Sequence, residues 1–263
     1  MRSDMETISL IGSGNAATHI GHALAKTGHR VNGVFSRTLA AAQALAGVLR
    51  CDATDNLETL PEADCYLFAV KDDALPGLAA RWGTLHPDSL CLHTAGSVPM
   101  DIFEGKVKSY GVLYPMQTFS KTRPVNFHDI PCFIEANNPE TLEKVTQLAR
   151  SVSDQVYVLS SERRRWLHVA AVFACNFSNH CYDIAARLLE KEGIPSDTLL
   201  PLIDETAAKI HELPARKAQT GPAVRFDQNV IGRHEQMLAD SPVLRQIYEL
   251  MSRHIHQYAQ END

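Results

Sequence analysis

The stretch that decides the fold is Thr7-Ile8-Ser9-Leu10-Ile11-Gly12-Ser13-Gly14-Asn15-Ala16-Ala17. A short apolar strand pattern runs into G-x-G-x-x-A, and a helical pattern follows over Asn15–Lys26. Gly12 permits a tight turn, Gly14 lets the backbone approach a pyrophosphate, and Ala17 keeps the helix close to the strand. The free N–H groups at the start of the helix then face the phosphates. We predict a dinucleotide-binding turn; the alternative is a Gly-rich turn in an α/β domain that binds no nucleotide.

The end of the second predicted strand, Arg30–Phe35, favours NADP over NAD. An NAD site usually has Asp or Glu there for the ribose 2′-hydroxyl. Here Ser36 takes that position and Arg37 follows, and a hydroxyl with a guanidinium would hold a 2′-phosphate. The alternative is a solvated arginine at a helix start. The predicted cofactor-binding residues of the two turns are Gly12, Ser13, Gly14, Asn15, Ala16, Ala17, Ser36, Arg37 and Thr38.

The rest of the first half alternates strand and helix patterns. Strand patterns cover residues 65–70, Leu90–His93, 108–113, 133–134 and Val156–Val158, and helical patterns cover 38–46 and 139–150. This alternation predicts βαβ units and a parallel sheet. The fold class we expect is therefore α/β, with an N-terminal NAD(P)-binding Rossmann domain.

After residue 160 the pattern becomes helical. Residues 162–192 contain neither Gly nor Pro, so they predict one helix about 45 Å long at about 1.5 Å per residue. Further helical patterns cover 196–211 and run from 242 to the C-terminus. We therefore predict two domains: a Rossmann dinucleotide-binding domain, 1–160, and an all-helical substrate and dimerisation domain, 161–263.

Composition limits the class of protein. The chain has 263 residues, 44% of them hydrophobic, and a formal net charge of -6, so it offers no basic field for a nucleic-acid backbone. Its six cysteines form no C-x-x-C pair, which is typical of a reduced compartment. The N-terminal stretch lacks an apolar signal core, and no 18-residue apolar span occurs. We expect a soluble, cytoplasmic protein that binds neither membrane nor nucleic acid.

Metal and serine-hydrolase chemistry are not expected. The twelve histidines are scattered, and the sequence holds no H-E-x-x-H, cysteine cluster or carboxylate set. A nucleophile elbow is also missing.

Two loops that follow predicted strands should face the cofactor crevice, because ligands of α/β sheets bind at the carboxyl ends of the strands. Val70 ends one predicted strand and Lys71 follows it, and His93 ends the next and Thr94 follows it. We predict cofactor contacts for these four residues. Asp72 and Asp73, which follow Lys71, are interpreted as helix N-caps.

Three further polar residues are candidates for binding the substrate: Ser97, Gln117 and Arg225. Ser97 follows a strand, and its hydroxyl suits a carboxylate or carbonyl; capping a short helix is an equal alternative. Gln117 and Tyr114 lie in the Tyr114–Ser120 stretch, which is otherwise an irregular loop fixed by Pro115. Arg225 could clamp an acidic group bidentately, or be an exposed arginine in a helix connector.

The long predicted helix carries a polar stripe. The spacing i, i+4, i+8, i+11, i+12, i+15 places along one face His168, Val172, Asn176, Asn179, His180 and Asp183. His168 or His180 could donate a proton to a carbonyl or imine undergoing reduction. A satisfied core histidine or a polar dimer contact is the alternative.

Beyond this reading, the residues resemble known families. The Gly12–Ala17 motif resembles the opening of pyrroline-5-carboxylate reductases and of coenzyme F420-dependent NADP oxidoreductase-like proteins. Three later motifs together resemble the Rossmann-like family with a DUF2520 C-terminal domain: His93-Thr94-Ala95-Gly96-Ser97, Tyr114-Pro115-Met116-Gln117-Thr118-Phe119 and Thr220-Gly221-Pro222-Ala223-Val224-Arg225. This resemblance covers essentially the whole chain.

The resemblance implies a C-terminal domain of the 6-phosphogluconate dehydrogenase type, a homodimer, and an active site between domains. The related β-hydroxyacid dehydrogenases carry a Lys and an Asn one turn apart on the long helix. Asn176 matches that Asn, but Val172 stands at the position of the Lys, so their acid/base mechanism is in doubt here. Tyr114-Pro115-Met116 is also similar to the His-Pro-Met segment of prephenate dehydrogenases, with Tyr114 replacing the His.

The function we predict is an NADP-dependent oxidoreductase that moves hydride to or from a small carbonyl, imine or hydroxy compound. The candidate catalytic residues are His168, His180, Tyr114 and Asn176, with His168 the first choice of proton donor. The alternative is a non-catalytic NADP(H)-binding sensor or regulatory protein, and a weaker one is a module for another nucleotide.

Overall fold

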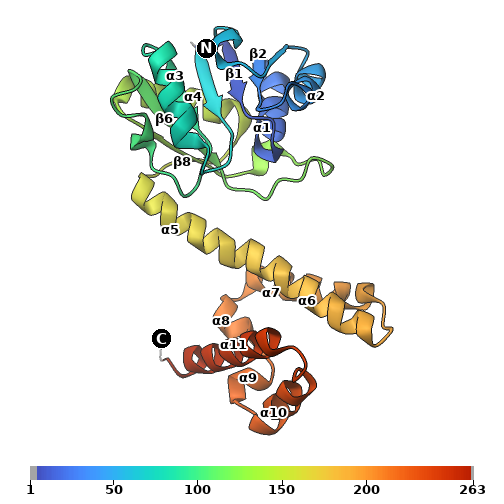
Figure 1. The fold of residues 1–263 in the computed structure, drawn as a ribbon. Coiled ribbons are helices and arrows are strands. Elements are labelled where there is room, and N and C mark those ends of the chain that lie inside the picture. Colours follow the sequence, from blue (N-terminus) through green and yellow to red (C-terminus); the bar gives the residue numbers. More distant parts are fainter. Residues whose placement is uncertain (1–4, 262–263) are drawn as a thin grey trace. The chain divides into compact units, whose positions relative to one another are not determined.

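The computed structural model describes residues 5–261 and contains two compact units, which divide between His180 and Cys181. Residues 1–4 and 262–263 lie outside the described part. Residues 1–4 belong to the predicted N-terminal stretch, and residues 262–263 to the end of the last predicted helix. The first unit holds the sheet and the second unit is helical (Figure 1). The predicted α/β class with a helical C-terminal region is confirmed.

An eight-stranded sheet forms the centre of the first unit. In spatial order its strands are β3 (Asp52–Thr54), β2 (Arg30–Phe35), β1 (Thr7–Ile11), β4 (Cys65–Phe68), β5 (Leu90–His93), β6 (Ser109–Pro115), β7 (Cys132–Ala136) and β8 (Val156–Val158). Neighbouring strands are parallel, except that β7 is antiparallel to β6. The carboxyl ends of β1, β2, β4, β5 and β6 therefore lie at one edge of the sheet.

Helices cover both faces of this sheet (Figure 1). One core lies under α1 (Asn15–Lys26), α2 (Leu39–Leu49) and α4 (Pro139–Val152). The other lies under α3 (Leu75–Leu85) and the short helices η1 (Leu57–Thr59) and η2 (Met100–Phe103). Both faces are covered, and all residues of β4 and β5 are buried. This explains why these strands read as continuous apolar runs.

The observed sheet differs from the predicted one in two respects. First, the short edge strand β3 was not predicted, because its three residues, one exposed and two half-exposed, carry no periodic signal. Second, the sheet is not wholly parallel. A parallel return needs a long crossover, usually a helix, whereas the segment between β6 and β7 contains only the short η3 (Phe127–Asp129). The chain therefore turns back, and β7 runs antiparallel.

The predicted long helix is continuous from Ser161 to Lys191 but is not uniform. It consists of α5 (Ser161–Ala171), a π-helical segment η4 (Val172–Phe177) and α6 (Ser178–Lys191). A π-helix closes i→i+5 bonds and so encloses one more residue per hydrogen-bonded ring than an α-helix does. The α-helical spacing behind the predicted polar stripe therefore does not hold across residues 172–177.

The second unit contains, after α6, the short η5 (Ser196–Leu199), α7 (Leu200–Glu212), α8 (Ala215–Ala218), α9 (Pro222–Arg225), α10 (Gln228–Met237) and α11 (Pro242–Gln260). Within it, α11 packs against α9 and α10. His256 stacks on Phe226 with ring centroids 4.7 Å apart, and its Nδ1 lies 3.2 Å from the Val224 carbonyl. The division between the units lies inside the long helix, and the predicted functional boundary at 160/161 stays a prediction.

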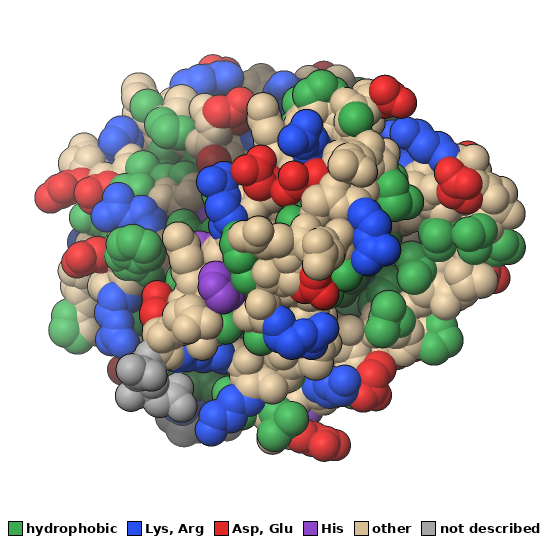
Figure 2. Space-filling model, turned by 90° about the horizontal axis from the view of Figure 1, so that it is seen from below, with side chains coloured by type: hydrophobic (Ala, Val, Ile, Leu, Met, Phe, Trp, Pro, Cys, Tyr) green, Lys and Arg blue, Asp and Glu red, His purple; other side chains and the backbone are tan. Residues whose placement is uncertain are grey.

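All six cysteines are free thiols. Cys65, Cys91 and Cys132 are buried in the sheet, and burial raises their pKa: to about 12 for Cys91, to about 11 for Cys132, and well above the usual value for Cys65. In residues 5–261 no group of His, Cys, Asp and Glu is arranged to hold a metal ion. Nor does any helix in that range have the length and hydropathy needed to span a membrane. On the face shown in Figure 2, basic and acidic side chains are interspersed and form no single-sign field.

Candidate active site

The turn between β1 and α1 depends on the lack of a side chain at Gly12. Its φ is +126°, and its N–H donates to the Phe35 carbonyl over 2.8 Å. A Cβ at this position would lie 2.2 Å from the carbonyl oxygen of Ala69. The turn after β1 thus fits between the ends of β2 and β4 only with glycine.

The first turn of α1 is open to a ligand. Gly14 is the N-cap residue, and no side chain caps the helix. A Cβ on Gly14 would meet no atom within 4 Å, and Gly14 and Asn15 are exposed, while Ala17 is buried against the core. The N–H groups that begin the helix, Ala16 among them, therefore keep their positive potential for an anion. Free backbone N–H groups of this kind are what the binding of a pyrophosphate requires.

The end of β2 lies beside this turn. The Ser13 hydroxyl donates to the Ser36 hydroxyl over 2.9 Å, and the Ser36 N–H donates to the Thr54 carbonyl over 3.1 Å. Arg37 and Thr38 are exposed, and within residues 5–261 the Arg37 guanidinium has no hydrogen bond or ion pair. The structure thus brings the two predicted halves of the NADP site together, with a positive charge available at the 2′ side.

Other predicted cofactor residues lie at the same edge. Val70 and Lys71 follow β4, Val70 half-buried and Lys71 exposed. Thr94 follows β5, where its N–H donates to the Phe68 carbonyl over 3.1 Å. The exposed Asn15 amide donates to the Phe119 carbonyl over 2.7 Å, so it ties the start of α1 to the loop after β6.

The side chain of His93 is fully buried rather than exposed to a crevice. Its Nδ1 accepts a hydrogen bond from the Ala95 N–H over 3.1 Å. Burial, and then the positive charge of Arg164, lower its pKa to about 3, while the Pro99 carbonyl acts in the opposite direction. His93 is therefore a neutral imidazole that shapes the turn after β5.

The turn after β5 meets Tyr114 and His168. The Tyr114 hydroxyl lies 3.3 Å from His168 Nδ1, so β6 and α5 each contribute one member of a hydrogen-bonded pair. A Cβ on Gly96 would lie 2.5 Å from His168 Nδ1 and 3.0 Å from Tyr114 Cζ. Gly96 thus makes room for this pair. Burial raises the pKa of the Tyr114 phenol. The positive charge of Arg164 lowers this pKa, and the negative charge of Asp72 raises it. The net shift is upward, so the phenol stays protonated near neutral pH.

The other polar residues of this edge are arranged differently from the prediction. The Ser97 hydroxyl donates to the Asp72 carboxylate. Asp72 and Asp73 are not helix caps, since the N-cap of α3 is Ala74 and no side chain caps that helix. Gln117 is exposed, and its Oε1 accepts from the Thr118 N–H over 2.8 Å. Ser97 and Asp72 therefore form a second polar pair, across the turns that follow β4 and β5.

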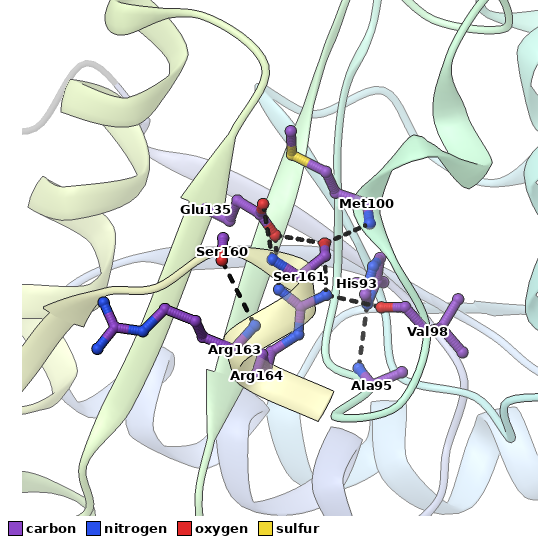
Figure 3. Close-up of polar contacts among 9 residues, drawn as sticks. All are labelled: His93, Ala95, Val98, Met100, Glu135, Ser160, Ser161, Arg163 and Arg164. Atoms are coloured by element: carbon purple, nitrogen blue, oxygen red, sulfur yellow. Dashed lines mark hydrogen bonds and ion pairs between the residues drawn. The ribbon is translucent and has the colours of Figure 1, made fainter. Parts of the chain in front are cut away.

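A buried arginine holds the start of α5 against the sheet (Figure 3). Arg164 is fully buried and donates to Glu135 Oε2 over 2.7 Å and to the Val98 carbonyl over 2.6 Å. The Ser161 hydroxyl donates to Glu135 over 2.5 Å and accepts from the Arg164 guanidinium and from the Met100 N–H. We call these contacts the Arg164 network. It links α5, β7 and the loop after β5, and so positions His168, one helical turn further along α5.

Two predicted site residues of the first unit are not brought into this cluster. Asn176 and His180 are exposed, and their side chains make no hydrogen bond within residues 5–261. Arg225 is exposed at the end of α9, in the second unit. Of the predicted polar stripe, His168 alone has a partner at the sheet edge.

Four contributors to this cluster were not predicted from the sequence: Gly96, Asp72, Glu135 and Arg164. Arg164 lies in the basic run 163–165, which is typical of a solvated helix face. Ser160-Ser161 was the available signal, because a helix that starts right after the last strand has its first turn close to the sheet.

Two family models match parts of the chain. A family model described as "NADP oxidoreductase coenzyme F420-dependent" matches residues 7–95, and one described as "Domain of unknown function (DUF2520)" matches residues 130–255. A search of curated proteins finds no match.

Solved structures match nearly the whole chain. A candidate NADP oxidoreductase from Bacteroides fragilis is 48% identical, with a TM-score of 0.92, over 96% of this chain and 98% of that one. A pyrroline-5-carboxylate reductase from Coxiella burnetii is 18% identical, with a TM-score of 0.60, over 98% of each chain. An imine reductase from Myxococcus stipitatus, in complex with NADP+, is 14% identical, with a TM-score of 0.67, over 95% of this chain and 93% of that one. The last two show the fold alone.

The sheet and the open βα turn define a Rossmann fold, and the 48% identical structure places the chain among NADP oxidoreductase-like proteins. The chain belongs to the Rossmann-like family that carries the DUF2520 domain.

Proposed function

We propose that the protein is an oxidoreductase that moves a hydride between NADP(H) and a small carbonyl, imine or hydroxy compound. The observation that carries this proposal is the uncapped first turn of α1, set behind Gly12. The family match and the fold shared with an imine reductase and a pyrroline-5-carboxylate reductase support it.

The residues present fit the cofactor. The backbone around Gly14 would hold the pyrophosphate, because no Cβ or cap fills the space there. Ser36 and Arg37 would hold the 2′-phosphate, and the turns at Lys71 and Thr94 would line the remainder of the cofactor. When bound, NADPH supplies the hydride.

The chain itself would supply the proton. A carbonyl oxygen or imine nitrogen that gains a hydride must also gain a proton. The Tyr114 phenol is protonated near neutral pH, and His168 Nδ1 is placed to exchange a proton with it. We propose Tyr114 and His168 as this donor pair, with Ser97 and Asp72 as polar contacts for the substrate. Roles for His180, Asn176, Gln117 and Arg225 stay predictions.

Cofactor titrations test the proposal. NADPH should bind in a fluorescence titration, and no response at millimolar cofactor would end the proposal. Arg37→Ala should weaken NADPH binding about 10- to 100-fold, as expected for loss of a charge-assisted contact, and should leave NADH binding nearly unchanged. Arg30→Ala is a matched control, because Arg30 is exposed at the opposite end of the same strand. Equal losses for both cofactors would contradict the NADP preference.

Measuring turnover distinguishes an enzyme from a cofactor sensor. The sensor is the alternative that Val172 favours, because this valine stands where the related dehydrogenases carry a Lys. We expect NADPH oxidation with at least one member of a panel of small carbonyl compounds and cyclic imines. Tyr114→Phe should lower kcat and leave the Kd for NADPH unchanged. Binding without turnover across the panel would instead support the sensor.

We also propose that the protein is a cytoplasmic homodimer whose residues 161–263 serve as the substrate and dimerisation domain. Four large apolar side chains of the long helix are 46–73% exposed in the single chain: Trp166, Val169, Phe173 and Phe177. Exposed apolar surface of this kind marks protein–protein contacts. Sedimentation should give twice the chain mass, and Phe173→Glu should shift it toward the monomer.

A further inference from the structure

A cavity of about 740 Å³ lies on the first unit, outside the cofactor turn. It is lined by the middle and end of α1, by the segment that leads to η3, and by the end of α4; residues 12–17 do not line it. The residues around it are Thr18, His19, His22, Ala23, Lys26, Thr27, Lys121, Pro124, Val125, Asn126, Phe127, His128 and Val152. Its volume is in the range of small-molecule sites.

The lining is basic, although the chain as a whole is acidic. It contains two lysines and three histidines and no Asp or Glu, whereas the chain carries a net charge of -6. The side chains of His22, Lys26 and Lys121 have no hydrogen bond or ion pair within residues 5–261. His128 is paired with Asp154 over 3.1 Å, and Lys26, in the last turn of α1, also compensates the helix dipole. Lys121 therefore contributes the least compensated positive charge.

One wall of the cavity is built into the core. His19 is 8% exposed, and its Nε2 bonds the Ser120 carbonyl over 2.9 Å. Its ring stacks on Phe119 at 4.9 Å, and Phe119 stacks on Phe127 at 6.0 Å. This aromatic stack fixes the loop after β6 against α1, so the cavity exists before any ligand enters.

We propose that this cavity binds a compact small molecule that carries two or more phosphate groups. Lysine ammonium groups are common phosphate ligands, and here they lie on two separate chain segments, as a ligand with several anionic groups requires. The Thr18 hydroxyl already donates to the Gly14 carbonyl over 2.9 Å, and the Asn126 amide donates to the Asp129 carboxylate over 2.8 Å. The two lysines therefore carry the recognition of the anion. The site is separate from the cofactor turn, so the proposal does not depend on the oxidoreductase assignment.

Inorganic pyrophosphate is the probe, titrated by calorimetry into protein saturated with NADP+ so that the first turn of α1 is not available to it. We expect binding of one pyrophosphate per chain. Lys26→Ala/Lys121→Ala should weaken it by about tenfold or more, since two nearby positive charges are lost. Lys191→Ala/Lys217→Ala removes the same charge from exposed positions in the second unit and should leave it unchanged.

Imidazole NMR signals locate the ligand and need no cofactor. Pyrophosphate should shift the signals of His19, His22 and His128 and leave those of His234 and His254 in place. The proposal is overturned if no heat is measured, if both double variants bind equally, or if the three cavity histidines do not respond. Unchanged circular dichroism of the variants shows that they remain folded.

Discussion

The β1–α1 turn and the Arg164 network each hold a helix start against the same sheet, with opposite chemistry. At the turn, α1 approaches because a side chain is missing at Gly12, and the uncapped Gly14 leaves the amides of the helix start open. In the network, α5 approaches because a fully buried guanidinium reaches Glu135 and two backbone and side-chain oxygens. The first arrangement leaves N–H groups open for a ligand. In the second, both terminal nitrogens of the guanidinium are bonded within the protein, Nε alone of its nitrogens lacks a partner in residues 5–261, and α5 is held so that His168 lies at the sheet edge.

The largest effect should come from the network. Arg164→Ala leaves the Glu135 carboxylate without its partner in a mostly buried position, which typically costs about 3–5 kcal/mol. Urea unfolding of the variant should show this loss. Arg163→Ala, at the exposed neighbouring position, should change stability by less than about 0.5 kcal/mol. Similar effects for the two variants would mean that the buried arginine does not anchor α5.

Acidic pH should lower the stability of the folded protein through His93, which lies close enough to Arg164 for its charge to act on the imidazole. His93 has a folded pKa of about 3, below its unfolded value of 6.5, so the unfolded chain binds more protons between these values and stability falls as pH falls through that window. At about 1.4 kcal/mol per pKa unit, the loss at pH 4 is about 3 kcal/mol.

His93→Asn tests this, because an amide oxygen can accept from the Ala95 N–H but does not titrate. Measured as unfolding free energy against pH, the variant should lose most of the slope between pH 6.5 and 4, whatever its stability at neutral pH. A slope equal to that of the wild type would assign the acid sensitivity elsewhere.

Gly96→Ala should give an intermediate effect. The added methyl group would lie 2.5 Å from His168 Nδ1, so His168 must move away from Tyr114, at a cost of about 1–3 kcal/mol. NADPH affinity should not change. Gly77→Ala is the control: Gly77 lies in α3 with no atom within 4 Å of the new Cβ, and alanine there should stabilise by about 0.5–1 kcal/mol. The sign of the change therefore separates the two sites in thermal melts.

The smallest effect on stability is expected at the cofactor turn. Gly14→Ala adds a methyl group to open space at φ −75°, so the free energy of unfolding should change by less than about 0.5 kcal/mol. NADPH binding should nevertheless weaken, because the methyl group occupies the position that a pyrophosphate would take. Gly12→Ala, by contrast, should destabilise the protein without any cofactor. Unchanged NADPH affinity in Gly14→Ala would remove the turn from the site.

The two regions also differ in how much of them could be predicted. The candidate cofactor residues lie in two short segments: Gly12, Gly14, Ser36 and Arg37. The geometry of the turn is local to the backbone, so the sequence pattern alone predicted the turn. It also predicted β1, α1 and β2 with their bounds. The Arg164 network joins residues 98, 100, 135, 161 and 164. Nothing local distinguishes Arg164 from its solvated neighbours, since burial depends on how β7 and the loop after β5 pack around it.

The π-helical segment escaped prediction for a similar reason. Val172–Phe177 has ordinary helix-forming composition, and an i→i+5 pattern leaves no trace in apolar spacing over a single turn. The stripe of His168, Asn176 and His180 was therefore predicted with the wrong phase, although His168 itself lies at the sheet edge as a site residue should.

The buried thiols of the sheet can report how fast the sheet opens, because they react with an alkylating reagent only after it has opened. Cys65, Cys91 and Cys132 are held as neutral thiols by their raised pKa, and only a thiolate attacks an alkylating reagent quickly. Labelling of these positions must therefore wait until the sheet opens, whereas Cys175 and Cys181 on the long helix are half-exposed. Mass spectrometry of a labelling time course would then report the opening rate of the sheet without any engineered probe.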